Sequence, residues 1–195
     1  MRLPDVILLN GSTSSGKTSI GRALQARLPE PYLLFGIDNI FPALPPSLCE
    51  TPLGYWFEQL PDGSMPVHLG EGFLQVARVW RRMIRAGVDA GLRFVIDDVW
   101  LTPEDRPDWR AALAGLDVLS VGVRCDLAEL QRREVARGDR GLGQAQSQHM
   151  LVHGFGGYDL EVDTSATPTA DCVAAILKHL AASSGLRTRP KSRPG

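Results

Sequence analysis

An eight-residue run near the amino terminus, Gly11-Ser-Thr-Ser-Ser-Gly-Lys-Thr18, sharply narrows the choice of folds. It matches the pattern G-x-x-x-x-G-K-[ST], and its surroundings fit this pattern. An apolar run predicts a strand over residues 5–10, and an apolar stripe predicts a helix over 17–28. A glycine-rich turn between a strand and a helix points successive backbone N–H groups at one spot, close to the positive end of the helix. The run therefore predicts a site for nucleotide phosphates.

Every residue of this phosphate loop (residues 11–18) is a candidate nucleotide ligand. The residues are Gly11, Ser12, Thr13, Ser14, Ser15, Gly16, Lys17 and Thr18. Lys17 is expected to reach the outer phosphates and so to take part in catalysis. Thr18 is expected to place its hydroxyl on Mg²⁺. A plain glycine–serine linker is the alternative, and the strand–turn–helix context disfavours it.

Strand-like and helix-like segments alternate along the rest of the chain, which favours a parallel sheet with helices on both faces. Expected strands cover residues 5–10, 32–37, 93–97, 116–123 and 158–162, and expected helices cover 17–28, 73–90, 126–137 and 170–182. The chain has 195 residues, and we expect one α/β domain over 1–183 followed by a flexible tail over 184–195.

Charge and cysteine content limit the classes of partner. The formal net charge is -1, and four of the basic residues (Arg187, Arg189, Lys191 and Arg193) fall in the tail, so the body is more acidic still. Such a balance argues against nucleic-acid and membrane-surface binding. The three cysteines are widely spaced, which is typical of a reducing cytoplasm. The amino-terminal apolar run is too short for a signal peptide, and no segment approaches the ~20 apolar residues of a membrane span.

A second nucleotide feature is the apolar run Phe94-Val-Ile-Asp-Asp98, which ends in two acids. A carboxylate at the carboxyl end of a strand beside the phosphate loop is suited to contact the metal. Asp97 is the candidate metal ligand. Asp98 is the alternative, or it faces the acceptor instead.

Asp38 follows the second expected strand and should lie at the same sheet edge as the phosphate loop. There it is suited to accept the proton of an attacking hydroxyl. The alternative, equally compatible with its position, is that Asp38 caps a short helix starting at Asn39.

Four arginines lie within nine residues: Arg132, Arg133 and Arg137 in a helix that we expect to end at Gly138, and Arg140 beyond that end, where the chain can hinge. An arginine beside a phosphoryl group in transfer stabilises its charge, so this segment predicts a lid over about 126–153 with Arg133 and Arg137 as catalytic residues. Asp126 and Glu129 predict a capping box at the start of the helix. The alternative is a solvated helix in which Glu129 pairs with Arg133.

Residues 41–72 are rich in proline and show no clear periodicity, which is typical of a functional or mobile segment. We expect them to form the acceptor-binding insertion. The run Tyr55, Trp56 and Phe57 is a candidate for contacts with a flat acceptor, with ordinary packing as the alternative.

Eight stretches spread along the chain resemble those of chloramphenicol phosphotransferases, small antibiotic kinases of the P-loop group that also includes shikimate and adenylate kinases. They are Ile7–Gly11, Ser15–Thr18, Leu28–Pro31, Phe35–Asp38, Ile96–Val99, Val121–Asp126, Arg133–Arg140 and Tyr158–Thr164. Residues 41–72 match this family poorly.

The resemblance implies a five-stranded parallel sheet, ATP with Mg²⁺ as the donor, and Asp38 as the base that takes the proton from the primary hydroxyl of chloramphenicol. It also implies that Arg133 and Arg137 steady the phosphate and that Thr164 lies near the nucleotide base. The expected protein is thus a cytoplasmic ATP-dependent O-phosphotransferase acting on a small molecule, such as an antibiotic in resistance.

Several alternatives stay open at this point. GTP in place of ATP, the acceptor and the oligomeric state are undecided. A metabolite kinase of the shikimate or gluconate type would share the fold, as would a nucleotide-binding sensor without catalysis. A polynucleotide 5′-hydroxyl kinase is disfavoured by the acidic body. Asp38 discriminates between kinase and sensor, because a sensor has no use for a base beside the terminal phosphate.

Overall fold

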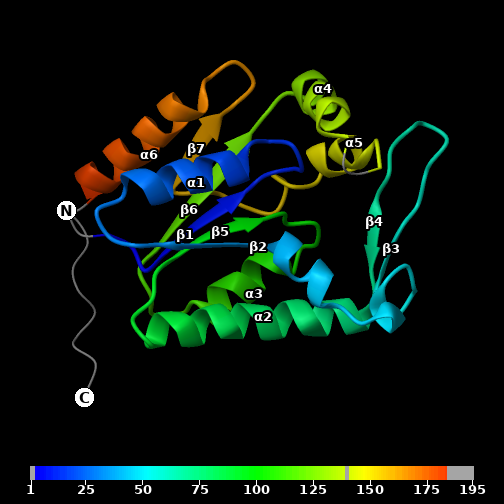
Figure 1. The fold of residues 1–195 in the computed structure, drawn as a ribbon, viewed down its shortest axis with the longest axis horizontal. Coiled ribbons are helices and arrows are strands. Elements are labelled where there is room, and N and C mark those ends of the chain that lie inside the picture. Colours follow the sequence, from blue (N-terminus) through cyan, green and yellow to red (C-terminus); the bar gives the residue numbers. More distant parts are fainter. Residues whose placement is uncertain (1–2, 139–140, 184–195) are drawn as a thin grey trace.

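A computed structural model describes residues 3–138 and 141–183 of the chain (Figure 1). The predicted basic tail and Arg140 lie outside these described residues. The centre of the fold is a five-stranded sheet in the order β2-β5-β1-β6-β7, in which all neighbouring strands run parallel. The strands are β1 (Val6–Asn10), β2 (Leu33–Gly36), β5 (Phe94–Asp98), β6 (Val118–Arg124) and β7 (Leu160–Asp163).

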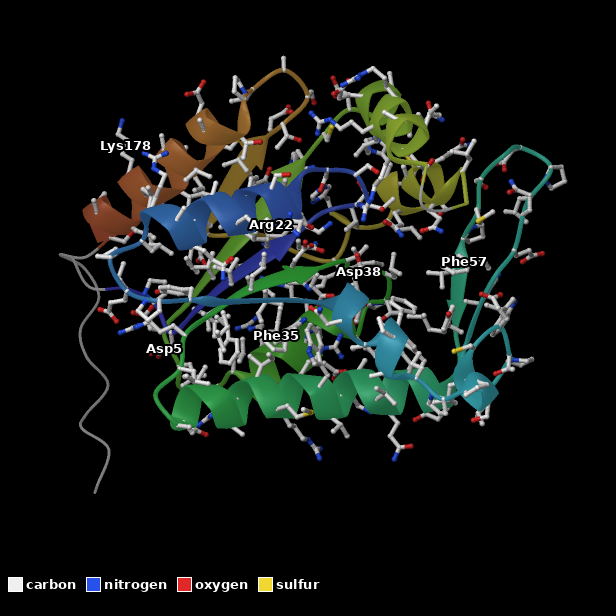
Figure 2. All side chains as sticks on the ribbon, in the orientation of Figure 1. Asp5, Arg22, Phe35, Asp38, Phe57 and Lys178 are labelled. Carbon is white, nitrogen blue, oxygen red and sulfur yellow. The ribbon has the colours of Figure 1, made fainter. Side chains whose placement is uncertain are left out.

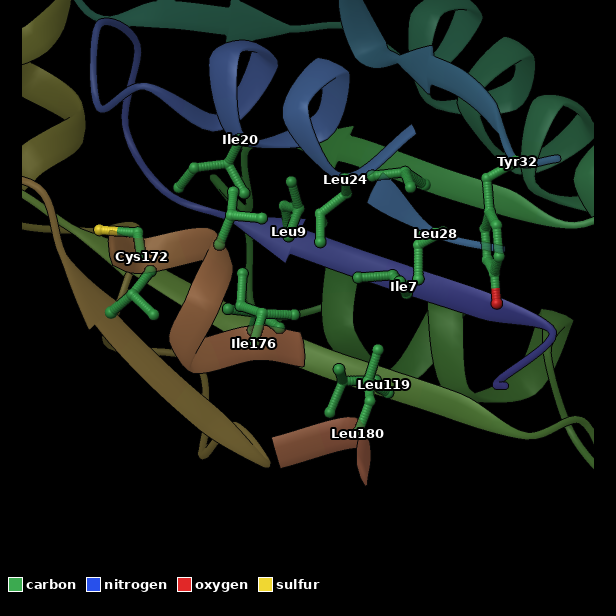
Figure 3. Packing of buried hydrophobic residues seen from close by; sticks show 14 of the residues in the cluster. Ile7, Leu9, Ile20, Leu24, Leu28, Tyr32, Leu119, Cys172, Ile176 and Leu180 are labelled. Carbon is green, nitrogen blue, oxygen red and sulfur yellow. The ribbon is translucent and has the colours of Figure 1, made fainter. Parts of the chain in front are cut away.

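Helices cover both faces of this sheet, so the fold has three layers (Figure 1). On one face α1 (Lys17–Arg27) packs against α6 (Thr169–Ser183), and the core between them and the sheet includes Ile7, Ile20 and Ile176 (Figure 3). On the other face lie α2 (Glu71–Asp89) and α3 (Asp105–Ala112), over a second core that contains Leu8, Trp80 and Trp109. The central strand β1 is buried from end to end because it contributes to both cores. The predicted α/β fold is therefore confirmed.

The remaining elements gather at the carboxyl ends of the strands. Helices α4 (Leu127–Arg137) and α5 (Gln144–His149) pack against each other beside the phosphate loop. A separate hairpin pairs β3 (Tyr55–Phe57) with β4 (Val67–Leu69) in antiparallel register, and it stands opposite α5 (Figure 1). Short 3-10 turns at Ile37–Asn39, Phe41–Ala43 and Pro46–Leu48 lead from β2 toward this hairpin.

Sequence patterns located the sheet strands to within a few residues, but they did not predict three elements. These are α3, α5 and the hairpin formed by β3 and β4. None of the helices in the described part of the chain has the length and apolar character needed to cross a bilayer.

Candidate functional site

The phosphate loop joins the end of β1 to the start of α1, as its sequence predicts. Ser14 and Gly16 both adopt left-handed backbone conformations, with φ of 61° and 90°. Placing left-handed residues within a turn curls the chain so that backbone N–H groups converge, which creates an anion-binding concavity. The left-handed conformation costs glycine little, whereas Ser14 is strained in it. A strained residue at this point is typical of a functional loop.

Lys17, Thr18 and Asp97 come together at one end of the loop. The Lys17 ammonium donates to the Ser12 carbonyl over 2.9 Å and lies 3.5 Å from a carboxylate oxygen of Asp97. The Thr18 hydroxyl donates to the other oxygen of Asp97 over 2.5 Å. The register Leu9 opposite Asp97 explains this contact, because it brings the end of β5 beside the loop that follows β1. The residues expected to hold phosphate and metal are therefore neighbours.

Asp98 has a different environment from Asp97. Its carboxylate is buried and accepts hydrogen bonds from the Trp109 indole and, over 2.9 Å, from the Val99 amide. Burial and the nearby charge of Asp105 raise the pKa of Asp98 above its ordinary value. Of the two neighbouring acids, Asp97 is the one beside Thr18, while Asp98 lines the cavity that extends away from it.

Arg133 reaches from α4 to the phosphate loop. Its guanidinium donates to the Thr164 carbonyl over 2.6 Å, to the Thr164 hydroxyl over 3.2 Å and to the Ser14 carbonyl over 3.4 Å. The Thr164 hydroxyl in turn donates to the Ser15 carbonyl over 2.8 Å. Thr164, which was expected near the nucleotide, thus lies directly against the loop.

The pairing of Glu129 with Arg133, our alternative to a lid contact, is also present at 2.7 Å. The contact with Arg132, followed by that with Arg133, lowers the pKa of Glu129 to about 2. The predicted capping box is wrong, because the Asp126 side chain makes no cap hydrogen bond. Glu129 instead accepts charge-assisted hydrogen bonds from Arg132 and Arg133.

A cavity of about 1090 Å³ extends from the phosphate loop toward the hairpin. Lys17, Thr18, Arg133 and Arg137 line it at the nucleotide end. The other end has mostly apolar walls from several elements. The apolar side chains that line this end belong to Ile37, Phe41, Pro42, Tyr55, Phe57, Met65, Val67, Leu69, Phe73, Leu74, Ala77, Val99 and Leu101.

Asp38 lines the same cavity, between its two ends (Figure 2). It lies within the 3-10 turn Ile37–Asn39 and not before a helix that begins at Asn39. The contact that closes this turn comes from Asn39, whose side-chain oxygen accepts a hydrogen bond from the Gly36 amide over 2.7 Å. Asp38 therefore does not cap a helix that begins at Asn39, and its role as base stays a prediction.

The hairpin separates the three aromatic residues that we expected to act together. Tyr55 and Phe57 line the cavity, and Tyr55 packs edge-on against Phe41 with ring centres 4.8 Å apart. Trp56 instead stacks on His68, with ring centres 4.7 Å apart and an interplanar angle of 12°. Successive side chains of a strand point to opposite faces, so Trp56 is turned away from the cavity.

Several further polar residues line the cavity and were not identified from the sequence, among them Arg22, Arg81, Gln144 and Gln148. The buried Arg81 guanidinium pairs with Asp105 at 2.5 Å and Asp108 at 3.1 Å. The available signal for Arg81 was its spacing of four and eight residues from Ala77 and Phe73, which also line the cavity.

Comparisons with known proteins give the family and the fold of this chain. The model of a family described as "Chloramphenicol phosphotransferase-like protein" matches residues 4–181. The Mycobacterium tuberculosis protein named "Putative O-phosphotransferase Rv2636" is 37% identical over 172 residues, which are 84% of this chain and 76% of that protein.

Solved structures with low sequence identity show the same fold. A sugar kinase from Janibacter sp. HTCC2649 has a TM-score of 0.66 at 15% identity, covering 96% of this chain and 100% of that one. Shikimate kinase from Acinetobacter baumannii has a TM-score of 0.59 at 17% identity, covering 93% and 95%. The Mycobacterium tuberculosis APS kinase in complex with AMPPNP and APS has a TM-score of 0.57 at 13% identity, covering 91% and 98%. These structures show that the chain has the P-loop kinase fold. The family match and the Mycobacterium tuberculosis relative show that it is a phosphotransferase of the chloramphenicol phosphotransferase-like family.

Proposed function

We propose that this protein transfers the γ-phosphate of ATP to a hydroxyl group of a small, largely apolar molecule, with chloramphenicol as the first candidate. The observation that carries this proposal is the shared cavity. It joins the phosphate loop, the carboxylate of Asp38 and an apolar wall that includes Tyr55 and Phe57. Aromatic walls with a few polar groups suit an apolar acceptor that is oriented by its hydroxyl.

The charges at the acceptor end favour such a molecule over an anionic metabolite such as a sugar acid. Arg81 is buried there and is already paired with Asp105 and Asp108. Asp38 and Asp98 add further acids to the same wall. An anionic acceptor would meet this acidic surface, and its carboxylate would have to compete with two protein carboxylates for Arg81.

The donor end supplies groups for the phosphates and for Mg²⁺. Lys17 and the loop amides hold the outer phosphates. The oxygens of Thr18 and Asp97, 2.5 Å apart, provide the hard oxygen ligands that Mg²⁺ prefers, so the residues present fit this ion. When bound, Mg²⁺ neutralises part of the charge on the phosphate oxygens.

Transfer proceeds by direct in-line attack of the acceptor hydroxyl. The oxygen–phosphorus bond to the acceptor forms while the bond from the γ-phosphorus to the β-phosphate oxygen breaks, and the hydroxyl proton passes to Asp38. Arg133 and Arg137 stabilise the charge on the moving phosphoryl group from the lid side. The products are the phosphorylated acceptor and ADP.

A transfer screen with γ-labelled ATP tests the proposal. Chloramphenicol and other hydroxylated antibiotics form one arm, and metabolites such as shikimate and gluconate form the other. We expect label on an apolar alcohol. Label on anionic metabolites alone would refute the acceptor class, and label on nothing but inorganic phosphate would refute the transferase.

A substitution tests the role of Asp38. Asp38→Asn should bind AMPPNP as the unaltered protein does but lose transfer by about 10² or more, because the proton acceptor is removed. Asp171→Asn, which changes an exposed carboxylate at the start of α6, serves as the matched control. Full transfer by the Asp38 variant would remove this residue from the mechanism.

A further inference from the structure

A side chain from a distant helix holds one amide of the phosphate loop. The Thr13 N–H donates to the side-chain oxygen of Gln148 over 2.7 Å. Thr13 is 5% exposed and Gln148 is 8% exposed, so water does not readily replace this bond. A buried amide that loses its partner is costly, which makes the conformation of the loop at Thr13 depend on Gln148.

Gln148 belongs to α5, and this helix is fixed from its other side by α4. The buried carboxylate of Glu134 accepts hydrogen bonds from the Gly143 and Ala145 amides, each over 2.9 Å. These two bonds satisfy backbone donors at the start of α5 that the helix itself cannot satisfy. Helix α5 is therefore held at its start, while Gln148 extends from its last turn to the loop.

The same helix also contacts the tip of the hairpin. The Met65 amide donates to the Gly143 carbonyl over 3.0 Å, and the Ser147 hydroxyl donates to the Met65 carbonyl over 3.0 Å. Gly143 has a φ of 99°, and a Cβ atom there would lie 2.1 Å from the Gly63 carbonyl oxygen. A residue with a side chain would thus be strained at this position and would push the hairpin tip away.

From these contacts we propose that Gln148 is a positioning residue of the phosphate loop. We also propose that the bond between Gln148 and Thr13 depends on docking of the β3–β4 hairpin, because the hairpin tip helps to hold α5 in place. The hairpin carries Tyr55 and Phe57 of the acceptor wall. This path connects the acceptor side of the cavity to the donor side, so its importance for catalysis rests on the proposed function. The hydrogen-bonded path itself does not depend on which acceptor is used.

Hydrogen exchange of the Thr13 amide, followed by NMR in the nucleotide-free protein, tests the first part. Gln148→Leu and Gln148→Asn should both raise this exchange rate by roughly three- to tenfold, because leucine has no acceptor and the amide oxygen of asparagine is held one methylene group farther from Thr13. Gln148→Glu should restore protection, since it keeps the accepting oxygen. Gln75→Leu makes the same chemical change at an exposed position of α2, away from α5, and should have no effect.

Binding of AMPPNP with Mg²⁺ is the second measurement. The Leu and Asn variants should bind it roughly three- to tenfold more weakly, because a loosened loop must be ordered again on binding. Unchanged Thr13 exchange in both variants would overturn the proposal. Faster exchange with unchanged binding would also overturn it, since the bond would then have no part in positioning the loop.

Gly143→Ala tests the dependence on the hairpin from a distance. It leaves Gln148 intact, yet it should undock the hairpin tip and raise Thr13 exchange in the same direction. If the variant folds and the Thr13 amide keeps its protection, the hairpin does not control the loop. Should it fail to fold, Ser147→Ala, which removes the hydroxyl bond to Met65, makes the same test more mildly. None of these measurements needs phosphate transfer, so they decide this inference even if the acceptor screen fails.

Discussion

Lowering the pH from about 7.5 to about 5 should destabilise this protein through His153. One ring nitrogen of His153 lies 2.9 Å from the Tyr158 hydroxyl. That hydroxyl accepts a hydrogen bond from Asn10 over 2.7 Å, and its oxygen lies nearer to the His153 nitrogen than to the Val152 carbonyl at 3.4 Å, so its own hydrogen is best donated to a neutral imidazole. Burial, followed by the charge of Arg124, lowers the pKa of His153 from 6.5 to about 4. Protonation of His153 would put an N–H on the ring nitrogen that now accepts the Tyr158 hydrogen, so two donors would face each other and this hydrogen bond would be lost.

The sign of the effect follows from where the proton binds. Between pH 6.5 and about 4 the unfolded chain takes up a proton on His153, whereas the folded protein does not. The stabilising contribution of the neutral ring is therefore complete above pH 6.5 and is lost as the pH falls toward about 4. With one pKa unit equal to about 1.4 kcal/mol, the loss at about pH 5 is at most about 2 kcal/mol. For a chain of this size that corresponds to roughly 4–8 °C in Tm.

Urea denaturation at the two pH values measures this loss. We expect the unaltered protein to lose up to about 2 kcal/mol more of its unfolding free energy than His153→Gln, which retains a polar side chain but cannot be protonated. His179→Gln controls for the general effect of removing a histidine, and it should lose as much stability as the unaltered protein. If His153→Gln is destabilised by acid to the same extent as the unaltered chain, His153 is not the group responsible.

Two other predictions concern the acceptor wall and the core. Phe57→Ala should raise the acceptor KM about tenfold in steady-state assays, since it removes about 1.5 kcal/mol of apolar contact with the acceptor. Trp56→Ala should change that KM much less, and equal effects would contradict the strand alternation. Gly122→Ala should lower the unfolding free energy by about 1–3 kcal/mol in urea denaturation, because overpacking forces the neighbouring ring to move. The new Cβ would lie 2.5 Å from the Tyr158 ring. Gly157→Ala, whose Cβ would have nothing within 4 Å, is the control.

The donor end of the site was predictable because the residues that form it are close together in the sequence. A strand, a glycine-rich turn and a helix follow one another within residues 5–28, and a turn of this kind offers its backbone amides to phosphates. Asp97 was predictable for a similar reason, since parallel strands place their carboxyl ends at one edge of the sheet. The close approach of Thr18 to Asp97 is consistent with both predictions.

The acceptor end was less predictable because its elements are short or lack a period. The hairpin strands Tyr55–Phe57 and Val67–Leu69 have three residues each, which is too short for an alternating pattern to be recognised. Without that pattern, the sequence could not show that Trp56 points to the opposite face of the hairpin from Tyr55 and Phe57. The hydrogen bond from Thr13 to Gln148 joins residues 135 positions apart, and nothing in the sequence near either residue indicates it.

The two ends of the cavity therefore differ in how they respond to amino-acid substitution. The proposed phosphate site relies on backbone amides, whose positions a side-chain substitution elsewhere alters little. The acceptor wall is built from side chains of the hairpin, α2, β5 and the turns after β2. Each of these side chains can be replaced at the cost of local packing, without loss of the phosphate loop. The bond between Thr13 and Gln148 limits this independence, because a hairpin that no longer docks on α5 would also disturb the loop. Substitutions that alter acceptor choice should thus be tolerated at the hairpin side chains that line the cavity. They should not be tolerated at the hairpin tip, where Met65 contacts Gly143 and Ser147.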